Sequence, residues 1–195
     1  MLYTIGKPGD AAAGVSILTA NSTTSLPITV FTANNPSSIR TAYADRTDSA
    51  GLSIGWSTAG PLNSLPAILY GISTPPTQRA SGATQSYPTS SQYHYVQIYG
   101  LQHSTVYYYQ IQADSSGGSA SDIYSIKTSH AAGDTTEHTM AMIGDFGLYN
   151  GEATHSALIN NLAEYEYVVH IGDISYADDF FASAGETYEG IWDKW

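Results

Sequence analysis

Two stretches near the C-terminal end of the sequence decide the fold: MAMIGDFG at residues 140–147 and VVHIGDISYAD at residues 168–178. Each begins with a short apolar run and continues into a Gly-Asp pair, a pattern that predicts a buried parallel strand. The carboxylates of Asp145 and Asp173 are then expected at the carboxyl edge of the sheet, where open α/β sheets bind ligands. About one βαβ unit of chain separates the two aspartates, which predicts adjacent or near-adjacent strands.

A helix is expected between these strands. Residues 150–152, Asn-Gly-Glu, offer a side-chain cap and an acidic first turn, and the helix is predicted over residues 153–164. Strand, helix and strand in this order require a parallel pair. Because one βαβ unit cannot cover both faces of its sheet, we expect the second domain to be incomplete at Trp195.

The chain before this unit reads as all-β. Short segments rich in Thr, Tyr, Val and Ile alternate with clusters of Gly, Pro, Asn and Ser, which is typical of a sandwich. Apolar residues alternate around Trp56, so its side chain is predicted to lie in the core. The expected strands cover residues 16–19, 28–32, 40–44, 52–57, 67–71, 93–98, 106–111 and 123–127.

Composition limits the partners and the kind of site. Six Lys and Arg stand against 17 Asp and Glu, for a formal charge of −11, so nucleic acid and anionic membranes are not expected partners. The sequence has no cysteine, which excludes disulfides and thiolate metal sites. No apolar stretch approaches the ~20 residues that span a bilayer. Residues 1–7 lack the apolar stretch of a signal peptide, so either the chain is cytosolic or a signal was removed before this numbering starts.

The residue types at the two Gly-Asp motifs point to a hard metal ion. Strands about 4.8 Å apart bring two carboxylates within reach of one ion or of a bridged pair, and pairs of ions are the usual clamp for phosphate ester hydrolysis. Tyr176 follows Asp173 closely and can turn back as a phenolate ligand, which favours Fe³⁺ over Zn²⁺. None of the six histidines has the spacing of a metal-binding pair. Asp178 and Asp179 are expected in a solvated turn or helix cap.

The sequence around these motifs resembles the purple acid phosphatases, a branch of the calcineurin-like metallophosphoesterases. Residues 144–147 are similar to the first motif of that family, and the tyrosine in GDISYAD at residues 172–178 distinguishes this branch. The β region resembles the fibronectin-type-III-like domain that precedes the catalytic domain in the family. The resemblance therefore implies an N-terminal extension at residues 1–35, a sandwich at 36–130, a linker at 131–137 and the truncated start of a metallophosphoesterase domain at 138–195.

The resemblance also implies roles for three residues. Asp145 would bind a ferric ion, Asp173 would bridge the ferric ion and a second divalent ion, and Tyr176 would give the ferric ion its charge-transfer colour. The implied reaction is hydrolysis of phosphate monoesters by a metal-bound hydroxide. No catalytic residue is expected beyond these metal ligands. The second ion, Zn²⁺, Mn²⁺ or Fe²⁺, needs family ligands that lie later in sequence, so this chain alone is not expected to bind it.

Two functions follow from these patterns. The chain is expected to be the N-terminal part of a secreted, extracellular acid phosphatase that is inactive by itself, with the remainder of the polypeptide or a C-terminal fragment as its partner. Its sequon at Asn21 is compatible with a secreted glycoprotein. The alternative is a β-sandwich structural or interaction module with a vestigial βαβ tail. The oligomeric state is not predicted.

Overall fold

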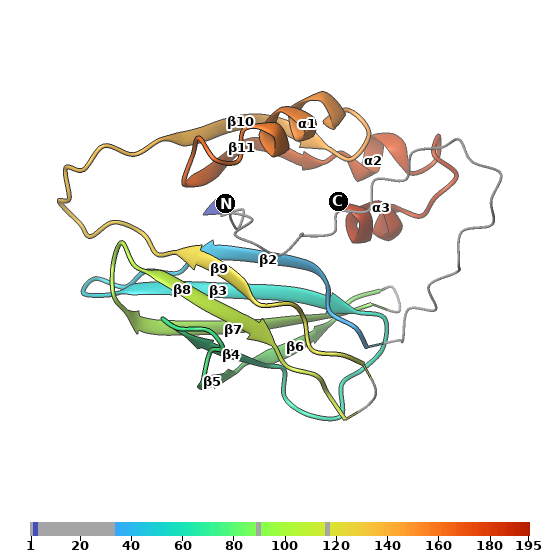
Figure 1. Cartoon of the computed structure of the whole chain (residues 1–195). Coiled ribbons are helices and arrows are strands. Elements are labelled where there is room, and N and C mark those ends of the chain that lie inside the picture. The colour runs from blue at the N-terminus through green and yellow to red at the C-terminus, as the bar shows by residue number, and fades with distance from the viewer. Residues whose placement is uncertain (1, 4–33, 89–90, 116–117) are drawn as a thin grey trace, which may run out of the picture.

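The computed structural model describes residues 2–3, 34–88, 91–115 and 118–195. Most of these residues form a β-sandwich, above which a smaller α/β unit lies in Figure 1. The predicted strands at residues 16–19 and 28–32, almost all of the expected extension at residues 1–35, and Asn21 lie outside the described residues. In the described part of the chain, no helix is long and apolar enough to cross a membrane.

The sandwich consists of two antiparallel sheets of four strands each. The first sheet has the order β2-β3-β7-β6, with β2 at Ser37–Tyr43, β3 at Ala50–Thr58, β7 at Gln92–Leu101 and β6 at Ala83–Ser86. The second has the order β5-β4-β8-β9, with β5 at Gln78–Ser81, β4 at Ala67–Gly71, β8 at Val106–Ile111 and β9 at Tyr124–Lys127.

Side chains that alternate along the strands fill the space between the two sheets. Leu52, Ile54 and Trp56 of β3 are at most 3% exposed, so the predicted core position of Trp56 is confirmed. Within the described residues, every buried side-chain nitrogen and oxygen atom has a hydrogen-bond partner. His94 lies in the core between the hydroxyl groups of Thr58 and Thr84, at 2.8 and 2.9 Å from its ring nitrogens.

The α/β unit follows the sandwich as the sequence predicts. Strand β10 (Met140–Gly147), helix α1 (Glu152–Asn160) and strand β11 (Tyr167–Ser175) form a parallel strand–helix–strand unit. The short β1 (Leu2–Tyr3) pairs antiparallel with β11, so the sheet order is β1-β11-β10. Helices α2 (Ala177–Phe180) and α3 (Tyr188–Lys194) complete the described chain.

Among the described residues, hydrogen bonds at both ends of the α/β unit join it to the sandwich. At one end, Glu166 accepts hydrogen bonds from Lys127 and His130, each at 2.9 Å. At the other end, Asp193 of α3 accepts hydrogen bonds from Ser91 and from the phenol of Tyr93. The α/β unit is therefore held at both ends of its strands.

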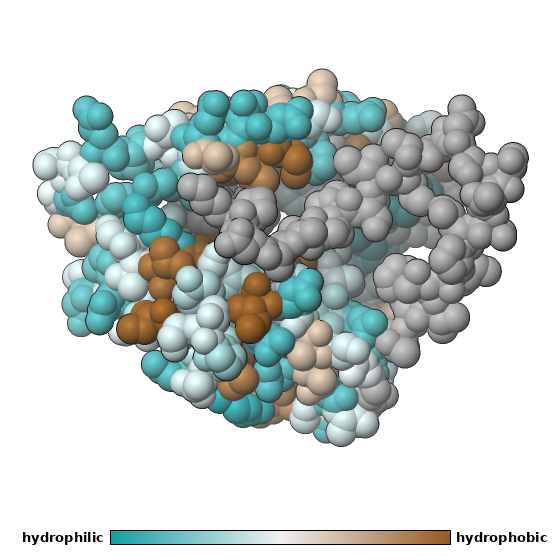
Figure 2. Space-filling view, in the orientation of Figure 1, coloured by the Kyte–Doolittle hydropathy of each residue, from teal (hydrophilic) through white to brown (hydrophobic). Residues whose placement is uncertain are grey.

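One face of the small sheet is exposed. Met142 and Ile171 lie on the same side of the parallel pair and are 63% and 55% exposed, and Met140 and Ile174 are exposed as well. Helix α1, all of whose residues are described, contains no buried residue, so it gives these side chains little cover. Figure 2 shows apolar residues on the surface of the β10–α1–β11 unit. This exposure agrees with the expectation that one βαβ unit cannot bury its own sheet.

Candidate metal centre

The two Gly-Asp motifs lie side by side at an irregularity in the pairing of β10 and β11. The register runs regularly from Met140 opposite Tyr167 to Gly144 opposite Ile171, and it resumes with Phe146 opposite Ile174. Asp145 on one strand therefore faces Gly172 and Asp173 on the other, which is the arrangement of a β-bulge. The strands were expected to end before the aspartates. Instead they pair again beyond them, so both carboxylates are placed within the ladder.

The backbone around the motifs adopts strained conformations. In the described part of the chain, five residues other than glycine have a positive φ, and three of them are Asp145, Ser175 and Tyr176 at 50°, 61° and 52°. Such left-handed conformations are unfavourable for side chains larger than those of Asn and Asp, and they are concentrated at functional sites. The bulge and these conformations together form a sharply bent segment at the motifs.

Gly172 makes room for the carboxylate of Asp145. The main-chain N–H of Asp173 donates a hydrogen bond to Oδ1 of Asp145 at 3.0 Å. Gly172 has a φ of 92°, and a Cβ at this position would lie 2.2 Å from the same Oδ1. A side chain at residue 172 would therefore displace the Asp145 carboxylate, which explains why glycine precedes the second aspartate.

Tyr176 turns back toward the aspartates. It caps helix α2 in a left-handed conformation, and its ring lies close to Gly147, where a Cβ would come 2.9 Å from its Cδ2. Partial burial, then the negative charges of Asp145 and Asp173, raise the pKa of its phenol, and a hydrogen bond to Asp145 adds to the effect. The structure thus brings Asp145, Asp173 and Tyr176 together. Asp178 and Asp179 lie exposed in the first turn of α2.

The donor set fits a trivalent ion. Two carboxylates and a phenol are hard oxygen donors, and the three groups lie close enough to one another for both carboxylates to act on the phenol. A bound cation would relieve their repulsion and favour loss of the phenol proton. Across residues 34–88, 91–115 and 118–195, however, no group of three or more His, Asp and Glu side chains could hold a metal ion. The metal role of Asp145, Asp173 and Tyr176 stays a prediction from the sequence; what the structure adds is that the three residues lie together.

His170 is the site residue that the sequence did not indicate. The sequence predicts a satisfied core residue, and the side chain is indeed 8% exposed. Its Nε2, however, lies 3.0 Å from the main-chain oxygen of Asp173, one of the predicted ligands. The sequence signal that could have indicated this contact is a histidine three residues before the motif aspartate. Its apolar neighbours make it look like an ordinary core residue of the strand.

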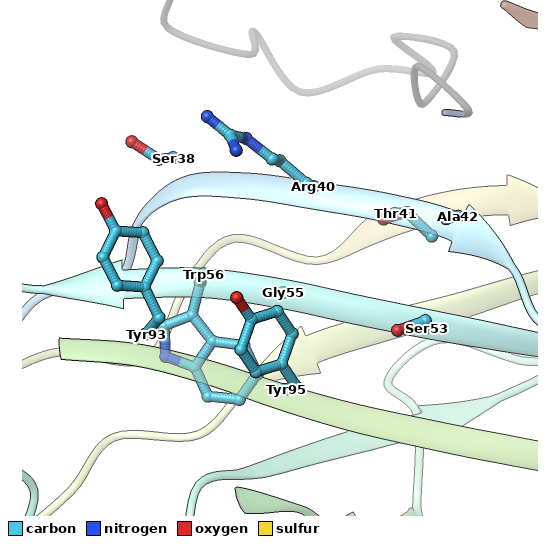
Figure 3. Close-up of a pocket in the computed structure, with 9 residues that line it drawn as sticks. All are labelled: Ser38, Arg40, Thr41, Ala42, Ser53, Gly55, Trp56, Tyr93 and Tyr95. Atoms are coloured by element: carbon cyan, nitrogen blue, oxygen red, sulfur yellow. The ribbon is translucent and has the colours of Figure 1, made fainter. Parts of the chain in front are cut away.

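A separate cavity of about 190 Å³ lies on the outer face of the sandwich (Figure 3). The ring of Tyr95 lies over Gly55, and Arg40 and Tyr93 border the cavity as well. The described residues that line it include no carboxylate and no histidine: Ser38, Arg40, Thr41, Ala42, Ser53, Gly55, Trp56, Tyr93 and Tyr95. This cavity therefore offers no carboxylate or imidazole among its described lining residues that could add to the residues at the Gly-Asp motifs.

Comparison with known proteins identifies the sandwich. The sequence model of the family described as "Purple acid Phosphatase, N-terminal domain" matches residues 36–128. Residues 36–128 are a purple acid phosphatase N-terminal domain. The match covers both four-stranded sheets, from β2 to β9, and ends before the linker that leads to β10.

The sequence similarity to individual relatives continues beyond the sandwich into the α/β unit. The chain is 33% identical over 168 residues to an acid phosphatase of Aspergillus ficuum, covering 78% of this chain and 26% of that protein. Because residues 1–128 are about two thirds of the chain, this similarity must continue beyond the N-terminal domain. Purple acid phosphatase 15 of Arabidopsis thaliana is 33% identical over 124 residues, covering 55% of this chain and 23% of that protein.

A third relative matches a similar share of this chain. Acid phosphatase A of Cryphonectria parasitica is 27% identical over 187 residues, covering 80% of this chain and 36% of that protein. The chain thus spans about a quarter to a third of the length of these curated relatives. The matches cover the region similar to the purple acid phosphatase N-terminal domain and, for two of the relatives, continue beyond it, while most of the length of each relative lies outside them.

Proposed function

We propose that this chain is the N-terminal part of a secreted acid phosphatase that hydrolyses phosphate monoesters with a binuclear metal centre. In this proposal Asp145, Asp173 and Tyr176 hold the ferric ion. The observation that carries it is the bulge between β10 and β11, where the N–H of Asp173 donates to the Asp145 carboxylate at 3.0 Å. This contact brings the two motifs together although they are far apart in sequence.

Each of the three residues has a distinct part. Asp145, whose carboxylate accepts a hydrogen bond from the Asp173 N–H, would hold the ferric ion, and Asp173 would be the ligand shared with the second ion. Partial burial and the two neighbouring carboxylates raise the pKa of the Tyr176 phenol, so these neighbours favour the protonated phenol and a bound cation would oppose their effect. When bound, the ions supply Lewis acidity toward the phosphate and an activated water.

The remaining ligands are proposed to come from outside this chain. Three oxygen donors do not fill the coordination sphere of two ions, so Zn²⁺, Mn²⁺ or Fe²⁺ as the second ion requires further side chains. The remainder of the same polypeptide, or a separate C-terminal fragment, is the proposed source. The exposed apolar face around Met142 and Ile171 supports a need for further chain on this sheet.

A chimera tests the proposal. This chain is joined to the part of the Aspergillus ficuum acid phosphatase that follows its matching region, and p-nitrophenyl phosphate hydrolysis is measured at acidic pH with Fe³⁺ and Zn²⁺ supplied. We expect turnover by the chimera, none by the present chain alone, and a loss of at least about 100-fold in the D173N chimera, since the bridging ligand is lost. Equal turnover by the parent and D173N chimeras would refute the assigned role.

The alternative function is that of a β-sandwich interaction module without a metal centre. If the chain does not bind ferric nitrilotriacetate and the chimera is inactive although the unaltered relative is active, the chain is better described as a β-sandwich interaction module. The absence, within the described residues, of any cluster of three His, Asp or Glu side chains favours this alternative. Retention of iron by the chain would reject it.

A further inference from the structure

His170 occupies a fixed position behind the Gly-Asp motif of β11. Its side chain is 8% exposed and lies between two aromatic rings: Phe146 meets it edge-on with centroids 6.0 Å apart, and Trp195 is inclined to it at 6.0 Å. Its Nε2 lies 3.0 Å from the main-chain oxygen of Asp173. Because a carbonyl oxygen can only accept a hydrogen bond, this contact requires the proton to be on Nε2.

Asp173 is hydrogen-bonded through both its main-chain N–H and its main-chain oxygen. On one side, the N–H of Asp173 donates to Oδ1 of Asp145 at 3.0 Å. On the other side, His170 donates to the carbonyl of Asp173 at 3.0 Å. Both peptide groups that flank the Cα atom of Asp173 are therefore fixed, and with them the direction in which its carboxylate leaves the strand. The ladder cannot supply this hold, because its pairing is interrupted here.

The aromatic residues that contact the His170 ring are fixed by contacts of their own. The indole Nε1–H of Trp195 donates to the main-chain oxygen of Phe146 at 3.0 Å, so the two rings that contact His170 are linked to each other. The guanidinium of Arg40 lies over the Trp195 ring, 5.4 Å from its centroid. Since Arg40 belongs to β2, this series of contacts runs from the sandwich to the strand that carries Asp173.

We infer that His170 is a positioning residue of the metal centre: its Nε2–H holds the Asp173 carbonyl and thereby aims the Asp173 carboxylate. This inference rests on the proposed function for the identity of the bound ion, but the hold on the Asp173 backbone exists without any ion. Groups that orient metal ligands in this way commonly change metal affinity by about 10–100-fold when they are removed.

Three variants separate positioning from general stability. His170→Phe keeps a planar ring between Phe146 and Trp195 and removes the donor, whereas His170→Gln restores an N–H donor at about the same reach. Val168→Ala is the matched control, because Val168 is 4% exposed on the same face of β11 and has no polar contact with the motif. All three variants and the parent chain are compared by thermal unfolding and by NMR.

The metal-free measurement is hydrogen exchange of the Asp173 amide. We expect about a tenfold faster exchange in His170→Phe, corresponding to the loss of one hydrogen bond, and near-parent exchange in His170→Gln and Val168→Ala. An Asp173 amide that exchanges equally in His170→Phe and Val168→Ala would overturn the inference. In the parent chain, nitrogen NMR of His170 must show the Nε2–H tautomer. An Nδ1–H tautomer would overturn the inference even if His170→Phe did not fold.

A titration with ferric nitrilotriacetate separates this inference from the proposed function. We expect the visible charge-transfer band to need about 10–100-fold more iron in His170→Phe than in the parent, with recovery in His170→Gln. If the parent binds no iron and the chimera described above is inactive, while the Asp173 amide still responds to His170→Phe, the proposed function fails and the positioning holds. If all variants bind iron equally, the positioning inference fails and the proposed function holds.

Discussion

Protonation of His130 is expected to strengthen the junction between the sandwich and the α/β unit. The imidazole lies between two carboxylates: Nδ1 is 3.2 Å from Asp134 and Nε2 is 2.9 Å from Glu166. Hydrogen bonds to Asp134 and then to Glu166 raise its pKa above 6.5, against smaller opposing effects of burial and of Lys127. The charged ring donates to both carboxylates, but a neutral ring has one N–H and leaves one carboxylate facing a lone pair.

The direction of the pH dependence follows from the raised pKa. A group whose pKa is higher in the folded than in the unfolded chain stabilises the fold fully below the unfolded value, here about 6.5, and this contribution is lost as the pH rises through the folded value. Glu166 behaves in the opposite sense. Partial burial raises its pKa, but hydrogen bonds from Lys127 and His130 outweigh this effect, so the net shift is downward. The junction is therefore strongest in mildly acidic solution.

The expected magnitude is modest. Ion pairs at protein surfaces contribute roughly 0.2–1 kcal/mol each, and the contact with the partly buried Glu166 is expected to lie in this range. For a chain of this size, 1 kcal/mol changes the unfolding temperature by about 2–4 °C. His130→Gln should therefore lower the Tm by about 1–4 °C at pH 5.5, and by clearly less at pH 8.5, where the ring is neutral.

The assay compares calorimetric unfolding of the parent, His130→Gln and His155→Gln at the two pH values. His155 is exposed on α1, so its replacement controls for the loss of a titrating side chain. Exchange of the Glu166 amide, which donates to Thr139 O at 2.9 Å, reports on the junction itself. A loss of Tm in His130→Gln that is equal at pH 5.5 and 8.5 would refute the charge-based reasoning.

Three further results are expected. Gly172→Ala should abolish ferric binding without unfolding the sandwich, because its Cβ would lie 2.2 Å from Oδ1 of Asp145; retained binding would contradict this placement. Tyr176→Phe should eliminate the visible band of the ferric chain while the far-ultraviolet circular dichroism stays unchanged. Ile111→Ala should lower the free energy of unfolding by about 2–5 kcal/mol in urea titration, since Ile111 is 0% exposed in the sandwich core.

The sequence predicts the elements whose pattern is local. The central strands of the sandwich alternate apolar and polar residues, and β4 and β8 begin and end where the sequence predicts. Strands β5 and β6 were not predicted, because most of their side chains are exposed and polar at the edges of the sheets. The predicted side-chain cap of α1 is wrong: Gly151 caps the helix and no side chain bonds its first turn.

The sequence names candidate site residues, whose metal role stays a prediction, and it does not specify their geometry. Asp145, Asp173 and Tyr176 follow from the motifs, but the bulge that aligns them depends on pairing between two strands that are distant in sequence. The contact of His170 with Asp173 and that of His130 with Glu166 are equally invisible to periodicity. Each depends on how the chain returns on itself, which residue type and spacing do not specify.

The left-handed backbone at the first motif also affects how natural variation at the site should be read. Asp145 has a φ of 50°, a conformation that Asn, Asp and Gly adopt most readily, whereas Asp173 is not among the described residues with a positive φ. Selection for folding alone would therefore restrict position 145 to a few residue types, even in a lineage that had abandoned metal chemistry. Position 173 carries no such backbone restriction. Evolutionary drift after loss of catalysis should consequently become visible at Asp173 before it becomes visible at Asp145.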